Sequence, residues 1–149
     1  MRRDRAALGA ALTALALVAV ITSGYLTWVK LAGIIPECGP VKGCETVEAS
    51  PYSEVFGIPV ALPGFLMSLA ILVAVIAWWW NGDRRILYVP YVLGILGLFV
   101  VAYLTYLELF VIHAVCIWCV TFAIAIVGGW IVTLVAMRWA ARQAPAGTG

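Results

Sequence analysis

Charged side chains are scarce in this sequence. Only 11% of its 149 residues are Asp, Glu, Lys or Arg, whereas 65% are hydrophobic, far above the roughly one half of an ordinary soluble domain. His113 is the only Asp, Glu, Lys, Arg or His between Glu108 and Arg138. The net charge of +2, without a basic stripe, argues against nucleic acid as a partner. The composition therefore predicts an integral membrane protein that contacts membrane lipid.

Long apolar stretches account for most of the chain. Each supplies the roughly 20 residues that a helix needs to cross a bilayer core of about 30 Å. They cover residues 6–29, 58–80, 86–110 and 115–137. We therefore predict an all-α integral membrane protein, a bundle of four transmembrane helices in a single domain, residues 1–139. The small and polar residues 140–149 are predicted to form a disordered cytoplasmic tail.

The connections between these spans differ in length. Those at residues 81–85 and around 110–115 are short, which makes the flanking helices antiparallel neighbours. The connection at 30–57 is long, and a segment of that length is usually functional. Its glycines and prolines favour turns, with short helices where Ser50 can cap and Pro51 can take the first helical position. We expect this loop to cover a site at one end of the bundle.

Basic residues are distributed unevenly between the two sides of the predicted bundle. Short loops rich in Lys and Arg stay in the cytoplasm. Seven of the nine basic residues fall on the side of the termini: Arg2, Arg3, Arg5, Arg84, Arg85, Arg138 and Arg142. We therefore predict a multi-pass protein of the bacterial cytoplasmic (inner) membrane, with both termini cytoplasmic and all four cysteines on the outer face. That compartment is oxidising, so disulfides can persist there.

Cys116 and Cys119 form a Cys-x-x-Cys pair, CIWC, where the last span begins. Residues three apart lie on the same helical face. In the first turn of a helix, free N–H groups and the macrodipole favour a thiolate, which lowers the pKa of Cys116. Cys119, almost a turn further on, is expected to point into the bundle interior. Such a pair is typical of thiol–disulfide exchange or zinc binding.

A second pair, Cys38 and Cys44, stands in the long loop within CGPVKGC, whose glycines and proline allow a reversal that brings the sulfurs together. Four cysteines allow three pairings, and the sequence does not choose among them. A mobile loop pair beside a helix-mounted pair is the arrangement that serial disulfide exchange requires. The alternatives are static disulfides, a zinc-binding membrane scaffold, or a disulfide-stabilised small membrane transporter, although no span has an ionisable residue near its centre.

Motifs for the common bound redox cofactors are missing. The sequence has no Cys-x-x-Cys-His haem attachment site, no glycine-rich dinucleotide pattern after a strand, and no further cysteines for an iron–sulfur cluster. A lipid-soluble quinone is the electron acceptor that a membrane still offers. It could enter between helices and accept two electrons beside Cys119.

The ordered combination of these residues resembles the vitamin K epoxide reductase family, in its bacterial quinone-reducing form. The matching features are Cys38 and Cys44, Ser50 six residues after the second of them, FGIP at 56–59, and the CIWC that opens the last helix. The resemblance covers nearly the whole chain. The Dsb-type quinone reductases differ, because they carry their Cys-x-x-Cys pair in the first outer loop.

This resemblance implies a quinone-dependent thiol–disulfide oxidoreductase that supports disulfide-bond formation. It implies that Cys38 takes electrons from a partner, that Cys44 attacks Cys116, and that Cys119 meets the quinone, either menaquinone or ubiquinone, with no metal. The implied quinone-binding residues are Ser50, Phe56, Cys119 and Phe122. His113 could also help to keep a thiolate or pass a proton to the quinone, and Glu108 could serve similarly.

Two departures from the family pattern matter. Vertebrate members have a tyrosine four residues after the second active-site cysteine, where this chain has Ala123 with Phe122 as the nearest aromatic residue. Epoxide reduction is therefore not carried over by the resemblance. Many bacterial relatives carry a fused thioredoxin-like domain, whereas this chain ends at residue 149. We expect the redox partner to be a separate thioredoxin-fold, DsbA-like protein in the outer compartment.

Overall fold

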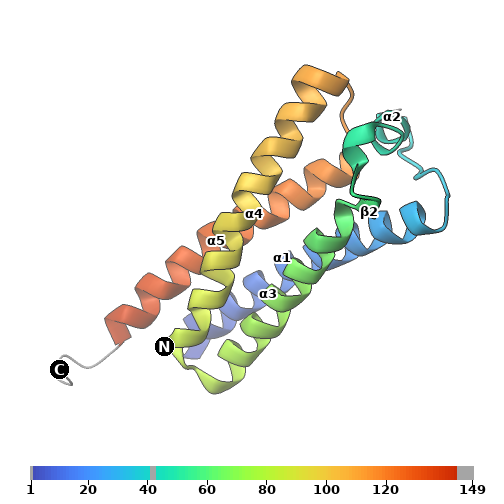
Figure 1. The fold of residues 1–149 in the computed structure, drawn as a ribbon. Helices are drawn as coiled ribbons and strands as arrows, with labels where there is room; N and C mark the ends of the chain where they lie inside the picture. The colour runs from blue at the N-terminus through green and yellow to red at the C-terminus, as the bar shows by residue number, and fades with distance from the viewer. Residues whose placement is uncertain (1, 41–42, 144–149) are drawn as a thin grey trace.

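Four long helices form the body of the molecule (Figure 1). The computed structural model describes residues 2–40 and 43–143. The long helices are α1 (Arg2–Leu31), α3 (Ala61–Asn81), α4 (Tyr88–Tyr106) with its π-helical continuation η3 (Leu107–Ile112), and α5 (Ile117–Gln143). α1 packs along both α3 and α5, and α4 packs mainly on α5. The predicted all-α bundle of four apolar helices is confirmed.

The outward faces of these helices are apolar, as lipid contact requires. All four are long and apolar enough to cross a membrane, and most of each span lies on the outside of the bundle. Large hydrophobic side chains that are more than half exposed include Ile21, Leu66, Val73, Leu96, Phe99, Ile124 and Ile131. A soluble monomer rarely exposes so much contiguous apolar surface. The chain is therefore a multi-pass membrane protein.

The helix ends differ in detail from the predicted boundaries. α5 continues to Gln143, so residues 140–143 of the predicted tail are helical, and residues 144–149 lie outside the described part of the chain. Residues 58–60, predicted to begin the second span, precede α3 instead. Pro63 and the glycine after it stand in the first turn of α3, where a proline is tolerated because its missing N–H has no partner in the helix anyway.

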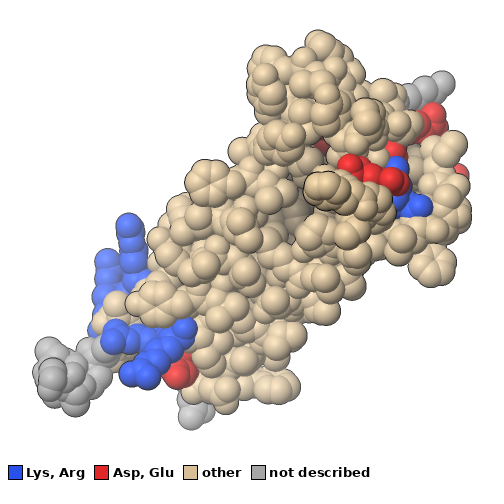
Figure 2. Space-filling model, in the orientation of Figure 1, with Lys and Arg blue, Asp and Glu red and all other residues tan. Residues whose placement is uncertain are grey.

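The two ends of the bundle carry different charges (Figure 2). Basic side chains gather at the end where α1 begins and α5 finishes, whereas acidic side chains gather at the opposite end, beside the loop that joins α1 to α3. At the basic end the Arg5 guanidinium donates to the Trp79 carbonyl, at the C-terminus of α3. The short helix η2 (Arg84–Leu87) is capped by the Asp83 carboxylate, which accepts from the Arg85 N–H at 2.9 Å. Hydrogen bonds therefore link the start of α1 to the end of α3 and cap η2 at this end of the bundle.

The loop between α1 and α3 carries the small elements. They are α2 (Cys44–Glu48), η1 (Pro51–Ser53), and the strands β1 (Glu54–Val55) and β2 (Ile58–Pro59), which pair antiparallel. Ser50 precedes η1 and Pro51 opens it. Phe56 and Gly57 form the two-residue turn of the hairpin with φ of 53° and 77°, as a type I′ turn requires. The short helices were predicted from the sequence, and the hairpin was not.

Lys30 fixes this loop to the end of α1. Its ammonium donates to the Glu48 carbonyl at 2.7 Å and to Ser53 Oγ at 2.8 Å. It also forms ion pairs with the carboxylates of Glu48, at 3.9 Å, and Glu54, at 3.4 Å. Both charged side chains of the Lys30–Glu48 pair are largely buried, at 20% and 16% exposed. The loop is therefore packed down on the bundle.

Candidate active site

Cys38 and Cys44 are joined by a disulfide within the loop. Their Cα atoms lie 5.9 Å apart, within the range that a disulfide spans. Gly39, with φ of 58°, supplies the reversal between them. The sequence left three pairings open, and the structure has this one. Cys44, the first residue of α2, is fully buried, whereas Cys38 is only partly buried.

Cys116 and Cys119 are both free thiols at the start of α5. Cys116 immediately precedes the helix, and its carbonyl accepts the first helical hydrogen bond, from the Val120 N–H at 3.0 Å. Cys116 is fully buried, beneath the loop. Cys119 lies one turn further on and lines a cavity inside the bundle, as the sequence predicted for the second cysteine of the pair. The two thiols therefore face different surroundings.

The local structure favours a thiolate at Cys116. The Cys119 side chain hydrogen-bonds to its sulfur, and the N–H groups of Cys119 and Trp118 add to this effect. Burial and the nearby Glu108 carboxylate oppose it. The net result is a pKa of Cys116 below the ordinary value for a thiol. A helix N-terminus commonly activates a cysteine in this way.

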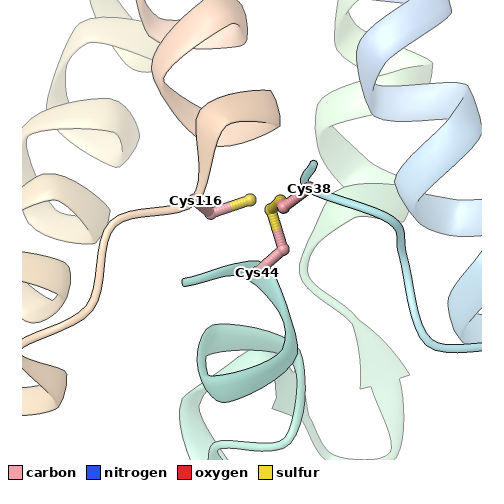
Figure 3. Close-up of side chains that lie close together, drawn as sticks. All are labelled: Cys38, Cys44 and Cys116. Atoms are coloured by element: carbon pink, nitrogen blue, oxygen red, sulfur yellow. A yellow bond between two sulfur atoms is a disulfide. The ribbon is translucent and has the colours of Figure 1, made fainter. Parts of the chain in front are cut away.

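Three sulfur atoms from the two pairs converge (Figure 3). The sulfurs of Cys38, Cys44 and Cys116 all lie within 4.8 Å of one another, and the Cys116 side chain points towards the loop disulfide. A thiolate at this distance can attack a disulfide sulfur after a small movement. Three sulfurs so close could also hold a metal ion, but the Cys38–Cys44 bond leaves Cys116 alone as a thiolate ligand in this state. The geometry therefore fits disulfide exchange.

Gly43 allows this close approach. A Cβ atom placed on Gly43 would overlap the Val115 carbonyl group and come within 2.9 Å of the Val115 nitrogen. The backbone angles of Gly43, φ −89° and ψ −26°, are ordinary for any residue, so glycine is needed for space. The residue before Cys44 thus packs against the residue before Cys116, and each cysteine is presented to the other.

Trp118 lies between the two cysteines of α5 and holds the other arm of the loop. Its Nε1–H donates to the Glu37 carbonyl at 3.2 Å, next to Cys38. Its ring packs on Tyr25 of α1, with centroids 4.7 Å apart. The indole therefore connects the loop, α1 and α5 at the site.

A cavity of about 360 Å³ lies within the bundle beside Cys119. It is enclosed by the last turns of α1, the first turns of α3, the second half of α4 and the first turns of α5. The short helices α2 and η1 cover it, and its wall is mainly apolar. Polar atoms are few and come from Lys30, Glu48, Ser50, Glu108 and Cys119, among others. A volume of roughly 300 to 1,000 Å³ with an apolar wall and a few polar groups is typical of small-molecule sites.

Only some of the predicted quinone-binding residues line this cavity. Cys119, Ser50 and Phe122 line it; Ser50 Oγ donates to the Val47 carbonyl at 2.6 Å, and Phe122 is 9% exposed within the packed core. Phe56 is fully exposed at the hairpin tip, and His113 is exposed with its Nδ1 3.3 Å from the Val111 carbonyl. Neither of these two lines the cavity, so their predicted contact with a quinone gains no support.

Lys30 and Glu48 also line the cavity, and the sequence did not indicate either of them. Burial raises the pKa of Glu48, while Lys30 lowers it and the neighbouring Glu54 carboxylate raises it further. The sequence does contain a signal for the pairing of Lys30 with the loop. The basic residue that ends α1 is followed by a loop rich in acidic residues, and such charges pair when a loop folds back onto a helix end.

The fold and the site together define a membrane thiol–disulfide oxidoreductase: two cysteine pairs meet at one end of a four-helix bundle, beside an apolar cavity. The sequence comparison agrees with this class. Residues 10–134 match the model of the vitamin K epoxide reductase family, and the chain belongs to that family. It is accordingly a quinone-linked thiol–disulfide oxidoreductase. No curated protein matches the chain significantly.

Proposed function

We propose that this enzyme oxidises a separate thioredoxin-fold, DsbA-like protein and passes the electrons through its two cysteine pairs to a quinone, as in the bacterial quinone-reducing branch of the family. Disulfide formation in the outer compartment is the process that it supports. The observation that carries the proposal is the convergence of Cys38, Cys44 and Cys116 within 4.8 Å. Cys119, next in the series, lines the cavity.

The first transfer brings electrons into the loop. Cys38 is the more accessible sulfur of the loop disulfide, so a thiolate of the partner attacks it and forms a mixed disulfide, with Cys44 as the leaving thiolate. The second partner thiol resolves the mixed disulfide. The partner leaves with a disulfide, and Cys38 and Cys44 are left as thiols.

The second transfer moves the same two electrons to α5. The Cys44 thiolate attacks Cys116 of a Cys116–Cys119 disulfide, which releases the Cys119 thiolate. Cys38 then attacks Cys44, restores the loop disulfide and releases Cys116. The product has a loop disulfide and two thiols on α5, which is the arrangement of sulfurs in the structure.

The cavity suits a quinone head group. Its volume of about 360 Å³ and its apolar wall fit a flat ring, and Cys119, Ser50 and Phe122 lie in that wall. A bound quinone would supply an acceptor for two electrons and two protons. Cys119 would present its sulfur to the ring, Phe122 would pack beside it, and the loop would exclude water. Menaquinone and ubiquinone both remain candidates.

We also propose that the termini face the cytoplasm of a bacterial cell and that the cysteines face the outer compartment. The support is the separation of charge along the bundle, with basic side chains at the end that carries the termini (Figure 2). Short basic segments stay cytoplasmic. Labelling of single cysteines placed at residues 83 and 54, with a membrane-impermeant reagent in intact spheroplasts, tests this orientation: residue 54 should react and residue 83 should not.

Anaerobic mixing tests the proposed reaction. Fully reduced protein is mixed with a ubiquinone or a menaquinone analogue, and thiol loss and quinol formation are followed together. We expect one quinol for each Cys116–Cys119 dithiol that is oxidised, and none from Cys119→Ser. The proposal is wrong if neither analogue oxidises the wild-type thiols. Oxidised protein should then accept electrons from a reduced thioredoxin-fold protein, and failure of Cys38→Ser to do so identifies the entry point.

A further inference from the structure

Glu108 is a buried carboxyl group at the end of the third span, close to the cysteine pair on α5. It is 5% exposed and belongs to η3, the π-helical turn that ends the third span. An acidic side chain within a span is costly and usually has a function. π-helical turns likewise occur frequently at functional sites. The position of Glu108 therefore requires an explanation beyond packing.

The backbone fixes the direction of this carboxyl group. The carbonyl of Glu108 accepts from the N–H of Ala114 at 3.1 Å and also from the N–H of His113, which has the left-handed φ of 55°. The chain thereby turns sharply after η3 and returns to α5. This turn directs the Glu108 side chain towards the N-terminus of α5, where the cysteine pair lies.

The Glu108 carboxylate lies between the cysteine pair and the cavity. Its Oε2 accepts from the Cys116 N–H at 3.4 Å. Glu108 also lines the cavity beside Cys119. The carboxylate therefore lies beside the cavity that holds the Cys119 sulfur, which must lose a proton, and the acceptor, which must gain one.

We propose that Glu108 is a catalytic residue that takes the proton of the Cys119 thiol and delivers it into the cavity, to the oxygen of the quinone. This rests on the proposed quinone reduction. Overall, the Cys116–Cys119 dithiol loses two electrons and two protons and closes to a disulfide, while a quinone becomes a quinol. Glu108 carries the Cys119 proton; the Cys116 proton leaves to water when its thiolate forms, and the second proton of the quinol is taken back from water. Glu108 ends the step ionised, as it began.

The other titratable groups that line the cavity are less suited to this task. Lys30 and Glu48 form an ion pair with each other under the loop, and Tyr52 belongs to η1. His113, the residue that the sequence favoured for proton transfer, is exposed and does not line the cavity. Among the described residues that line the cavity, Glu108 is the carboxyl group that also reaches the cysteine pair, through the N–H of Cys116.

A purely structural role is the competing explanation, since the same carboxylate receives the N–H of Cys116. Glu108→Gln separates the two roles, because the amide oxygen still accepts that hydrogen bond but cannot take a proton. Glu108→Asp keeps the acid with a shorter reach, and Glu45→Gln, on the exposed face of α2, is the matched control. Each variant is reduced, checked for folding, and mixed anaerobically with the quinone analogue that the wild type uses.

We expect Glu108→Gln to slow quinol formation by about 100-fold, the lower end of the contribution of general acid–base catalysis, with Glu108→Asp between it and the wild type and Glu45→Gln unchanged. A second readout needs no quinone: the infrared S–H stretching band of Cys119, in reduced protein carrying Cys116→Ser, should shift on Glu108→Gln. The proposal is overturned if Glu108→Gln keeps the wild-type rate, or if the S–H band does not move. If Glu108→Gln does not fold, the proposal is overturned when Glu108→Asp keeps the wild-type rate and the S–H band of Cys119 is the same in Glu108→Asp as with Glu108 intact. A wild type that oxidises no thiol overturns the proposed function instead.

Discussion

The two cysteine pairs differ in almost every physical respect, although the Cys116 sulfur lies within 4.8 Å of both sulfurs of the loop pair. Cys38 and Cys44 lie on a loop, bonded to each other, with Cys38 partly open to the outside. Cys116 and Cys119 lie at the rigid start of α5, and Cys119 faces an apolar cavity. The difference teaches that the loop leaves Cys38 within reach of solvent, whereas Cys116 is buried and Cys119 faces the cavity. Electron transfer between the pairs depends on the contact of Gly43, before Cys44, with Val115, before Cys116.

The largest effect is expected from separating the tasks of the two pairs. In pre-reduced protein, Cys119→Ser should abolish quinone reduction, because the sulfur that faces the cavity is gone. The double variant Cys38→Ala and Cys44→Ala should still reduce one equivalent of quinone in a single turnover, because the pair on α5 is intact. Quinol absorbance measures both. Loss of the single turnover in the folded double variant would show that the loop pair also serves the quinone.

A smaller but still large effect is expected from Gly43→Ala, which leaves all four cysteines in place. The added methyl overlaps the Val115 carbonyl group, and overpacking of this kind costs about 1–3 kcal/mol. Displacing the loop should slow exchange between the pairs by about 5- to 140-fold, since each 1.4 kcal/mol is a factor of ten.

Rapid-quench alkylation of the loop thiols measures this exchange. Single-turnover reduction of quinone by the pair on α5 should stay at the wild-type rate. Gly129→Ala, where an added Cβ meets nothing within 4 Å, is the control. An exchange rate equal to that of the control would show that the Gly43–Val115 contact does not set the distance between the pairs.

The third prediction concerns the attachment of the loop to α1. Lys30→Met removes two hydrogen bonds and leaves Glu48 buried without its partner, which costs about 1–3 kcal/mol. The loop should open more often, so that alkylation of buried Cys44 in the reduced protein becomes several-fold faster. Glu48 should also become harder to ionise, because Lys30 is the charge that lowers its pKa. Lys30→Arg should stay near the wild type. Equal alkylation rates in all three proteins would contradict this role of Lys30.

The smallest effect is expected from Trp118→Phe. The substitution removes the hydrogen bond to the Glu37 carbonyl and keeps most of the ring contact with Tyr25. One such bond is worth about 1 kcal/mol, so alkylation of Cys38 should become only a few-fold faster, while Cys116 is unaffected. Trp28→Phe, at a 69% exposed position of α1, is the matched control. A much larger effect would mean that Trp118 also covers the sulfurs.

The spans and the cysteine pairs could be predicted from the sequence because both have local signatures. A run of about 20 apolar residues is recognisable on its own, and the CIWC pair lies where the last helix begins. The short helix η1 likewise begins at Pro51 as predicted, but Ser50 does not cap it with its side chain, because its hydroxyl donates to the Val47 carbonyl. Each of these features is determined by residues close together in the sequence, so the sequence is sufficient to predict it.

The parts that were missed depend on contacts between distant segments. The closeness of Gly43 to Val115 and the ion pairs of Lys30 arise when the loop folds onto the bundle. The direction of the Glu108 side chain depends instead on the turn after η3, which the sequence did not indicate. The positive φ of Phe56 and His113 was equally hidden, because bulky residues are rare in that conformation. Neither side chain lines the cavity, although the resemblance implied that Phe56 binds the quinone and His113 could pass a proton to it.

Disulfide mapping of Cys119→Ser tests most directly the claim that the two pairs exchange with each other. Without Cys119, no thiol on α5 can resolve a mixed disulfide between the pairs, so it can only return to the loop disulfide through Cys38, and the two forms should coexist. Mass spectrometry of acid-quenched, alkylated protein should find a Cys44–Cys116 linkage with Cys38 free in part of the population. A Cys116 that is free in every chain, with Cys38 and Cys44 always bonded to each other, would contradict the relay.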